Sequence, residues 1–477
     1  MINKDIKYFL KHLNWKLLWI IIFTILIPVI YKTTRIYFIG QIDDGSNYSI
    51  AAQIQWLNVL YEIITEAIIV PIFYTIATLK KNIFQNKITN EIKQNYTLLT
   101  FIVFGVFLLF TIIIFFNISN LVNSIGIEDS NIIHSSIEYM RFETWAIFLT
   151  SCASFFIVSF SIFRLRWYEY VGIAVNIAYL VVNVLLDLFI VSDNSFSLKL
   201  NWVGLGISSI ASSGIYLLIC LVYFTLKGNR IFTIDWKLKY FQTKLYILPY
   251  FKNFLFAAME TTIRNVVFLL MVIKMVSMVG EQGTYWIANN FIWTWLLLPI
   301  SIISLFIKET HSSHIIFKNN LEKDKRYKIR FYLILTSIVV ILWLCFLPIN
   351  PMFINNVMGV SDYNTVNNLV LILFGFYICY AYSSIIDSIF ISNGKIGLFL
   401  IQTLVVNFTV YPIYFILYKL NIWTPTLNSI AIMFGIGLLI HLIVVVLILY
   451  IVNKYYYQLL IWKLSILNYF NKNKFPN

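Results

Sequence analysis

Residues 96–117 read YTLLTFIVFGVFLLFTIIIFFN, and no charged side chain interrupts the run. A helix rises about 1.5 Å per residue, so roughly 20 apolar residues cross the hydrocarbon core of a bilayer. The whole chain shares this character, because 60% of its 477 residues are hydrophobic and only 12% are charged. A soluble domain carries about 25% charged residues. The composition therefore excludes a soluble enzyme, a secreted disulfide scaffold and a disordered chain, and it predicts a protein embedded in a membrane.

Eleven similar runs flank this one, so we expect an all-α polytopic membrane protein with twelve transmembrane helices. In the first half the expected spans are Leu17–Phe38, Ile50–Leu79, Tyr96–Asn117, Ile137–Phe163, Tyr170–Val191 and Trp202–Leu226. In the second half they are Phe254–Val279, Tyr285–Ile307, Phe331–Ile349, Val366–Ile391, Ile396–Leu420 and Ile430–Val452. Pro71, Pro299 and Pro412 fall within spans, where a proline removes a backbone donor and can bend the helix.

The loops between these spans alternate in charge. The segment before the first span contains four lysines, whereas the next loop, 40–49, contains no basic residue. Every second connection after that again contains Lys or Arg, most strongly at 227–252 and 308–330. Because basic loops stay in the cytoplasm, both termini are expected on the cytoplasmic side. The same pattern accounts for the net charge of +14 without a nucleic-acid partner.

The chain also contains two segments of similar sequence, one in each half. Residues 48–56 read YSIAAQIQW near the start of the second span, and residues 285–293 read YWIANNFIW near the start of the eighth. Tyr, Ile, Ala and Trp recur at equal spacing, which favours two homologous halves of six helices. Parallel repeats of this kind build secondary transporters with a substrate site between the halves. The expected domains are a first lobe at 1–226, a cytoplasmic linker at 227–252, a second lobe at 253–452 and a basic aromatic tail at 453–477.

Charged residues at bilayer depth are costly, so each is a candidate functional residue. They are Arg35, Glu62, Glu66, Glu143, Asp187, Glu260, Arg264, Asp387 and His441. Three pairs one helical turn apart share a helix face: Glu62 with Glu66, Asn183 with Asp187, and Glu260 with Arg264. A carboxylate with an amide one turn earlier offers oxygen ligands and one titratable charge, which suits a proton or sodium ion. The alternatives are a polar clamp at Asn183 and Asp187, a structural ion pair at Glu260 and Arg264, glutamates facing water and a packing role for His441.

Several motifs resemble those of multidrug and toxic compound extrusion (MATE) transporters, which belong to the MOP exporter and flippase superfamily. The first span has a central Pro28 and ends Tyr37-Phe-Ile-Gly40, the fifth reads Asn183-Val-Leu-Leu-Asp187, and the sixth opens Gly204-Leu-Gly206-Ile-Ser-Ser. The turn after the tenth span reads Ser392-Asn-Gly394. The resemblance covers nearly the whole chain in order. It implies two pseudo-symmetric six-helix lobes in a V around a central cavity, with export by alternating access.

The resemblance also assigns roles to individual residues. Asn183 and Asp187 match the cation site of the first lobe, and Glu260 and Asp387 are similar to the carboxylates of the second lobe. The family's first-helix acid is replaced by Arg35, which could take the place of the bound cation. Three hypotheses follow: Glu260 and Asp387 couple transport to the ion, Arg35 and Asp187 form a gated ion pair, or coupling takes another form. Glu66, Glu143 and Arg264 are further candidates for lining the cavity.

The expected function is export of organic, amphipathic or cationic compounds across the cell membrane, driven by a proton or sodium gradient. The alternative within the superfamily is a flippase for lipid-linked oligosaccharide or polysaccharide. It needs basic residues for pyrophosphate, and the candidates are Arg35, Arg141, Arg264, Lys32 and Lys274. A polytopic acyl- or glycosyltransferase is the alternative of another class. We expect a non-enzymatic, monomeric plasma-membrane protein, of bacterial origin, with a small-molecule substrate, lipid contacts, no metal, no cofactor beyond the coupling ion and no nucleic acid.

Overall fold

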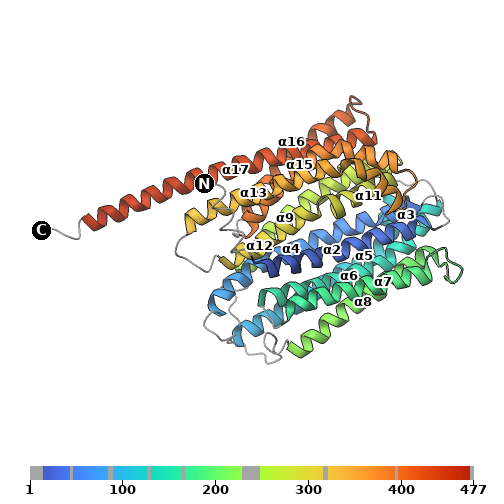
Figure 1. Cartoon of the computed structure of the whole chain (residues 1–477), viewed down its shortest axis with the longest axis horizontal. Coiled ribbons are helices and arrows are strands. Elements are labelled where there is room, and N and C mark those ends of the chain that lie inside the picture. The colour runs from blue at the N-terminus through green and yellow to red at the C-terminus, as the bar shows by residue number, and fades with distance from the viewer. Residues whose placement is uncertain are drawn as a thin grey trace.

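The computed structural model describes residues 14–42, 47–83, 90–125, 130–163, 167–227, 232, 248–314, 321–392 and 396–472. Within these ranges the chain forms helices joined by turns and short irregular segments, with no strand. The helices lie roughly side by side in one elongated bundle (Figure 1). Helix α2 begins and α17 ends at the same end of that bundle, as an even number of crossings requires.

The helices follow the expected order. In the first half they are α2 (Trp15–Gly40), α3 (Asn47–Ala52), α4 (Ile54–Ile83), α5 (Asn90–Ile125), α6 (Ser130–Phe163), α7 (Tyr168–Ile190) and α8 (Asn201–Lys227). The second half starts with α9 (Leu248–Phe268), the π-helical η4 (Leu269–Ile273), α10 (Lys274–Met278), α11 (Gln282–Phe291), the π-helical η5 (Ile292–Leu296) and α12 (Leu298–His314). It continues with α13 (Leu321–Phe346), the 3₁₀ turn η6 (Leu347–Ile349), α14 (Asn350–Asn356), α15 (Tyr363–Ser392), α16 (Ile396–Lys419) and α17 (Leu427–Lys472).

The predicted all-α membrane fold is confirmed. Ten helices of the described chain are long and apolar enough to cross a bilayer, and the bent pair formed by α11, η5 and α12 makes an eleventh. The remaining predicted span, Ile50–Leu79, corresponds to α3 and α4. The linker expected at 227–252 falls mostly outside the described residues. Residues 453–472 of the expected tail continue α17 beyond the bundle.

The span predicted as one run at Tyr285–Ile307 is bent by 54°. The bend lies at Leu297, whose N–H donates to the carbonyl of Ile292 at 2.8 Å, one residue beyond the ordinary helical partner. Pro299 follows two residues later and has no N–H to continue the ladder. The π-helical turn and the proline together explain why this span is a broken helix.

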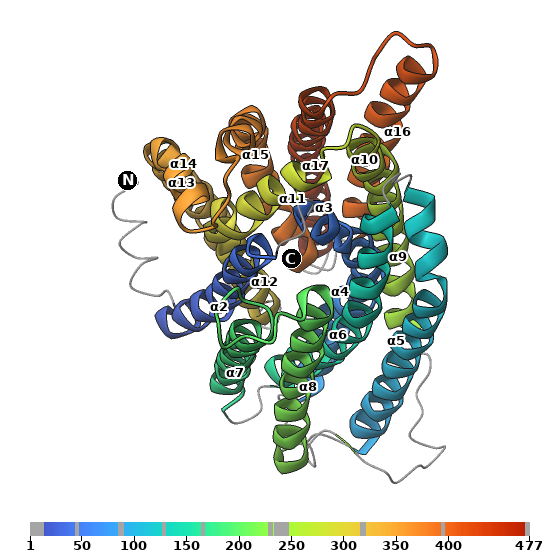
Figure 2. The same ribbon diagram turned by 90° about the vertical axis from the view of Figure 1, so that its right-hand side faces the viewer.

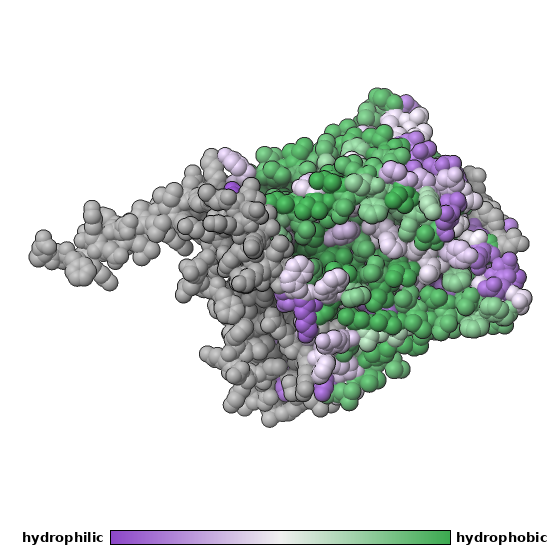
Figure 3. All heavy atoms as spheres, in the orientation of Figure 1, coloured by the Kyte–Doolittle hydropathy of each residue, from purple (hydrophilic) through white to green (hydrophobic). Residues whose placement is uncertain are grey.

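The outer surface suits a bilayer. Figure 3 shows a broad hydrophobic face along the helices, with polar residues collected at the end where the α2–α3 connection lies. Large apolar side chains such as Leu109, Phe116 and Phe408 are more than half exposed. An exposed apolar surface of this extent would aggregate in water and is normal in lipid.

The two halves of the chain form two groups of helices. In Figure 2 the helices α2 and α4–α8 gather on one side, and those from α9 to α17 on the other. The halves contact each other through α4 with α9, α2 with α12 and α3 with α11. One such contact is the indole N–H of Trp295, which donates to Thr33 Oγ1 at 2.8 Å.

The two segments of similar sequence, 48–56 and 285–293, contact each other at this boundary. Ile50 and Ala51 of α3 are buried, as are their counterparts Ile287 and Ala288 of α11. The backbones approach closely at Gly283, where an added Cβ would lie 3.3 Å from the backbone nitrogen of Ser49. The repeat motif therefore packs one half of the molecule against the other.

The contact between α15 and α17 depends on a missing side chain. A Cβ at Gly435 would overlap the ring of Phe376, whereas a Cβ at Gly375 would meet nothing within 4 Å. We expect Gly435→Ala to destabilise the protein by about 1–3 kcal/mol, the usual cost of overpacking. Thermal unfolding of the detergent-purified protein measures this. Gly375→Ala is the matched control on the facing helix, and equal melting temperatures for the two variants would contradict the prediction.

Candidate functional site

Arg35 lies in a buried polar cluster of the first half. Its Nη2 donates to Glu143 Oε1 of α6 at 3.0 Å and to the carbonyl oxygen of Leu205 in α8 at 2.7 Å. Its Nη1 donates to the hydroxyl of Tyr31 at 2.6 Å. Both charged side chains are 8% exposed. A buried guanidinium with these partners is a fixed positive charge inside the first half.

Asn183 and Asp187 of α7 belong to the same cluster. Ser208 of α8 donates to Asp187 Oδ1, and Asn183 Nδ2 donates to Ser212 Oγ at 3.0 Å. The predicted partners thus come together, but the ion pair of Arg35 among the described residues is with Glu143 rather than with Asp187. Helix α8 packs closely against α6 because Gly206 has no side chain. A Cβ at this position would overlap the side chain of Phe142 on α6.

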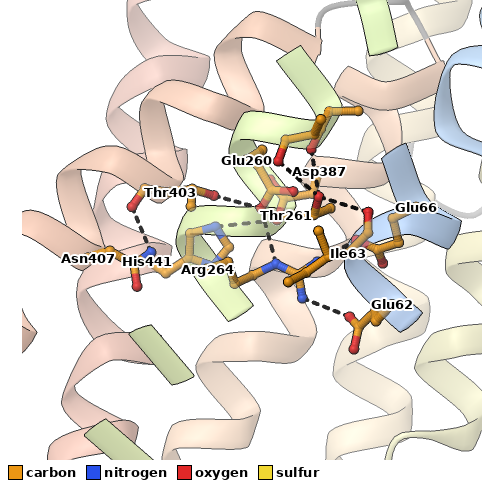
Figure 4. Close-up of polar contacts among 12 residues, drawn as sticks. Glu62, Ile63, Glu66, Glu260, Thr261, Arg264, Asp387, Thr403, Asn407 and His441 are labelled. Atoms are coloured by element: carbon orange, nitrogen blue, oxygen red, sulfur yellow. Dashed lines mark hydrogen bonds and ion pairs between the residues drawn. The ribbon is translucent and has the colours of Figure 1, made fainter. Parts of the chain in front are cut away.

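A second cluster lies between the halves, around Arg264 of α9 (Figure 4). Its Nε donates to Glu260 Oε1, one turn earlier on the same helix, at 3.1 Å. Its Nη1 donates to Glu62 Oε1 at 3.0 Å, and its Nη2 donates to Glu66, both on α4 of the other half. Glu260 also accepts a hydrogen bond from Thr403 of α16 at 2.9 Å. The three carboxylates carry more negative charge than the one guanidinium balances.

Asp387 of α15 lies beside this cluster, next to His441 of α17. His441 Nε2 is 3.5 Å from Asp387 Oδ2. Asp387 Oδ1 is buried and forms no well-aligned hydrogen bond among the described residues. The amide of the buried Gln402 lies close enough to act on this carboxylate, and neither of its polar atoms forms a well-aligned hydrogen bond there. Oxygen atoms left free in this way can accept a proton or ligate a small cation.

The structure adds residues that the sequence did not single out. Lys308 of α12 was expected in a basic loop, but it lies within electrostatic range of Glu66 and Asp387. The hydroxyls of Ser208, Ser209 and Thr403 bind the candidate carboxylates directly. Ser208 and Ser209 belong to the Gly204-Leu-Gly206-Ile-Ser-Ser motif noted in the sequence, which gave them no role, and Thr403 had no signal of its own.

Comparisons with known proteins concern the fold. No family model and no curated protein matches the chain. A mutant of the MATE transporter VcmN from Vibrio cholerae superposes with a TM-score of 0.71 at 13% identity, covering 93% of this chain and 97% of that one. A MOP superfamily transporter from Pyrococcus furiosus gives 0.69 at 14% identity, covering 90% and 93%. The eukaryotic MATE transporter AtDTX14 gives 0.69 at 12% identity, covering 91% and 95%.

These likenesses span nearly the full length of each protein, so they include both halves and their mutual arrangement. The predicted resemblance to MATE transporters is confirmed at the level of the fold. The chain is a multi-pass membrane protein with the fold of the MATE transporters of the MOP superfamily.

Proposed function

We propose that this protein is a secondary active antiporter that exports organic, amphipathic or cationic compounds by alternating access. The fold supports a transporter, and the second half of the chain supports coupling to an ion. The observation that carries the proposal is the pair of buried carboxylates Glu260 and Asp387, of which Asp387 Oδ1 forms no well-aligned hydrogen bond among the described residues. We assign to this pair the uptake and release of a proton or a sodium ion.

The first half has a different role in this proposal. Arg35 already supplies a positive charge to Glu143 and lies near Asp187. An ion entering this cluster would meet that charge. We therefore propose that the ion-coupled step takes place in the second half of the chain.

Two of the basic residues that a flippase would need to bind pyrophosphate are already paired with carboxylates. The guanidiniums of Arg35 and Arg264 are held by glutamates. A guanidinium in such a pair has fewer donors left for a pyrophosphate group. The carboxylates between the halves instead favour a substrate with a cationic group. We further propose that the protein acts as a monomer in the plasma membrane of a bacterium.

Dye accumulation in efflux-deficient bacterial cells tests the proposal. Cells that express the protein should retain less ethidium than cells with an empty vector. The difference should disappear either when sodium is replaced by choline or when a protonophore collapses the proton gradient, which identifies the coupling ion. An unchanged retention for every cationic dye, together with transbilayer movement of a fluorescent lipid-linked sugar, would favour the flippase instead.

A further inference from the structure

Arg264 joins the two halves of the chain through one side chain. It starts from α9 in the second half and reaches Glu62 and Glu66 on α4 of the first half. The same guanidinium contacts Glu260 on its own helix. Glu260 is one of the two carboxylates assigned above to the coupling ion. The positively charged guanidinium of Arg264 therefore contacts the same carboxylate that is proposed to bind the coupling ion.

The partners of Arg264 differ in their surroundings. The side chain of Glu260 is 1% exposed, whereas those of Glu62, Glu66 and Arg264 are 41%, 36% and 36% exposed. The α4 glutamates are thus more accessible to water than Glu260, and exposed ion pairs are weaker than buried ones. Glu260 is buried, and Thr403 of α16 in its own half also donates a hydrogen bond to it.

Other charges face the cluster from the neighbouring helices. Asp387 of α15 and Lys308 of α12 lie within electrostatic range, and His441 of α17 contacts Asp387. Glu260 and Arg264 both act electrostatically on Asp387. A coupling ion at Glu260 and Asp387 would consequently share its space with the Arg264 guanidinium.

We propose that Arg264 competes with the coupling ion for Glu260, and that Glu62 and Glu66 regulate this competition. The inference rests on the proposed function. When α4 lies against α9, as in this structure, Glu62 and Glu66 hold the two terminal nitrogens of Arg264 and only its Nε bonds to Glu260, which weakens the competition with the ion. When α4 moves away, Arg264 keeps only Glu260 and displaces the ion. Because coupling between two events is reciprocal, ion binding in turn favours contact between α4 and α9.

Two sets of substitutions test this, because the proposal gives them opposite signs. Arg264→Gln removes the competitor and should raise the affinity for the coupling ion about tenfold, within the usual range of coupling between sites. The double variant Glu62→Gln with Glu66→Gln leaves Arg264 on Glu260 and should lower the affinity by about the same factor. Arg264→Lys keeps a charge but cannot form the three-way contact. It should raise the affinity less than Arg264→Gln does.

The measurement uses the full chain in lipid nanodiscs, with tryptophan fluorescence as the signal. Sodium chloride is titrated against choline chloride at constant ionic strength, and a parallel series varies the pH. Arg141→Gln and Glu281→Gln are the matched controls and should leave the affinity unchanged. Shifts of one sign in both sets, or no shift in either, overturn the inference while the wild type responds to an ion. A wild type that responds to neither ion overturns the proposed function and this inference with it.

Discussion

Replacing Arg35 with methionine is expected to destabilise the protein by about 3–5 kcal/mol, the usual cost of removing one partner from a buried ion pair. The reason is that Glu143 would keep its charge in a closed environment, with the neutral hydroxyls of Ser209 and Tyr139 in place of a charged partner. The carbonyl of Leu205 would also lose its contact with the guanidinium. A fluorescence-detected melting curve of the purified protein measures the change.

A control substitution and a compensating second substitution both test the loss of stability expected for Arg35→Met. Arg141 lies on α6, two residues from Glu143, and is exposed, so Arg141→Met should leave the melting temperature nearly unchanged. Combining Arg35→Met with Glu143→Gln removes the uncompensated charge and should recover much of the loss. A single Arg35→Met variant as stable as the wild type would show that the pair does not hold the first half together.

Neutralising the ion site of the second half is expected to slow gradient-driven export strongly. Glu260→Gln and Asp387→Asn each remove a charge that the proposed ion needs. We expect the export rate to fall by about a hundredfold, near the upper end of typical coupling between sites. Uptake of a cationic dye into inverted vesicles, with and without the imposed gradient, measures this.

Asp362→Asn is the matched control, because Asp362 lies exposed at the start of α15 and bonds to Thr365 at 2.8 Å. It should transport normally. Full dependence on the gradient in both Glu260→Gln and Asp387→Asn would remove these carboxylates from the mechanism and shift attention to Asp187.

The sequence predicted the helical fold well because the signals of membrane spans are local. Apolar runs give each helix, and alternate basic loops give their directions. The breaks in the helices at Gln53 and Leu297 were not predicted from the sequence. The interruption at Gln53 lies where α3 packs on α11, a contact that the local sequence does not predict. The interruption at Leu297 lies next to Pro299, and this proline can be recognised in the sequence.

The candidate site was predictable within helices and much less so between them. Glu260 and Arg264 stand one turn apart, so their contact follows from helical geometry. The contacts of Arg264 with Glu62 and Glu66 join residues about two hundred positions apart, which no local pattern encodes. Arg35 lies near Asp187, as expected, but its ion pair is with Glu143 on another helix. Lys308 was assigned to a loop because basic neighbours follow it.

The meeting of α3 with α11 has a consequence for how this chain tolerates mutation. Two segments of similar sequence, one from each half of the chain, face each other there, and their backbones lie close together at Gly283. A substitution in either segment therefore changes the packing of the other, so a compensating substitution is expected in the opposite half of the chain.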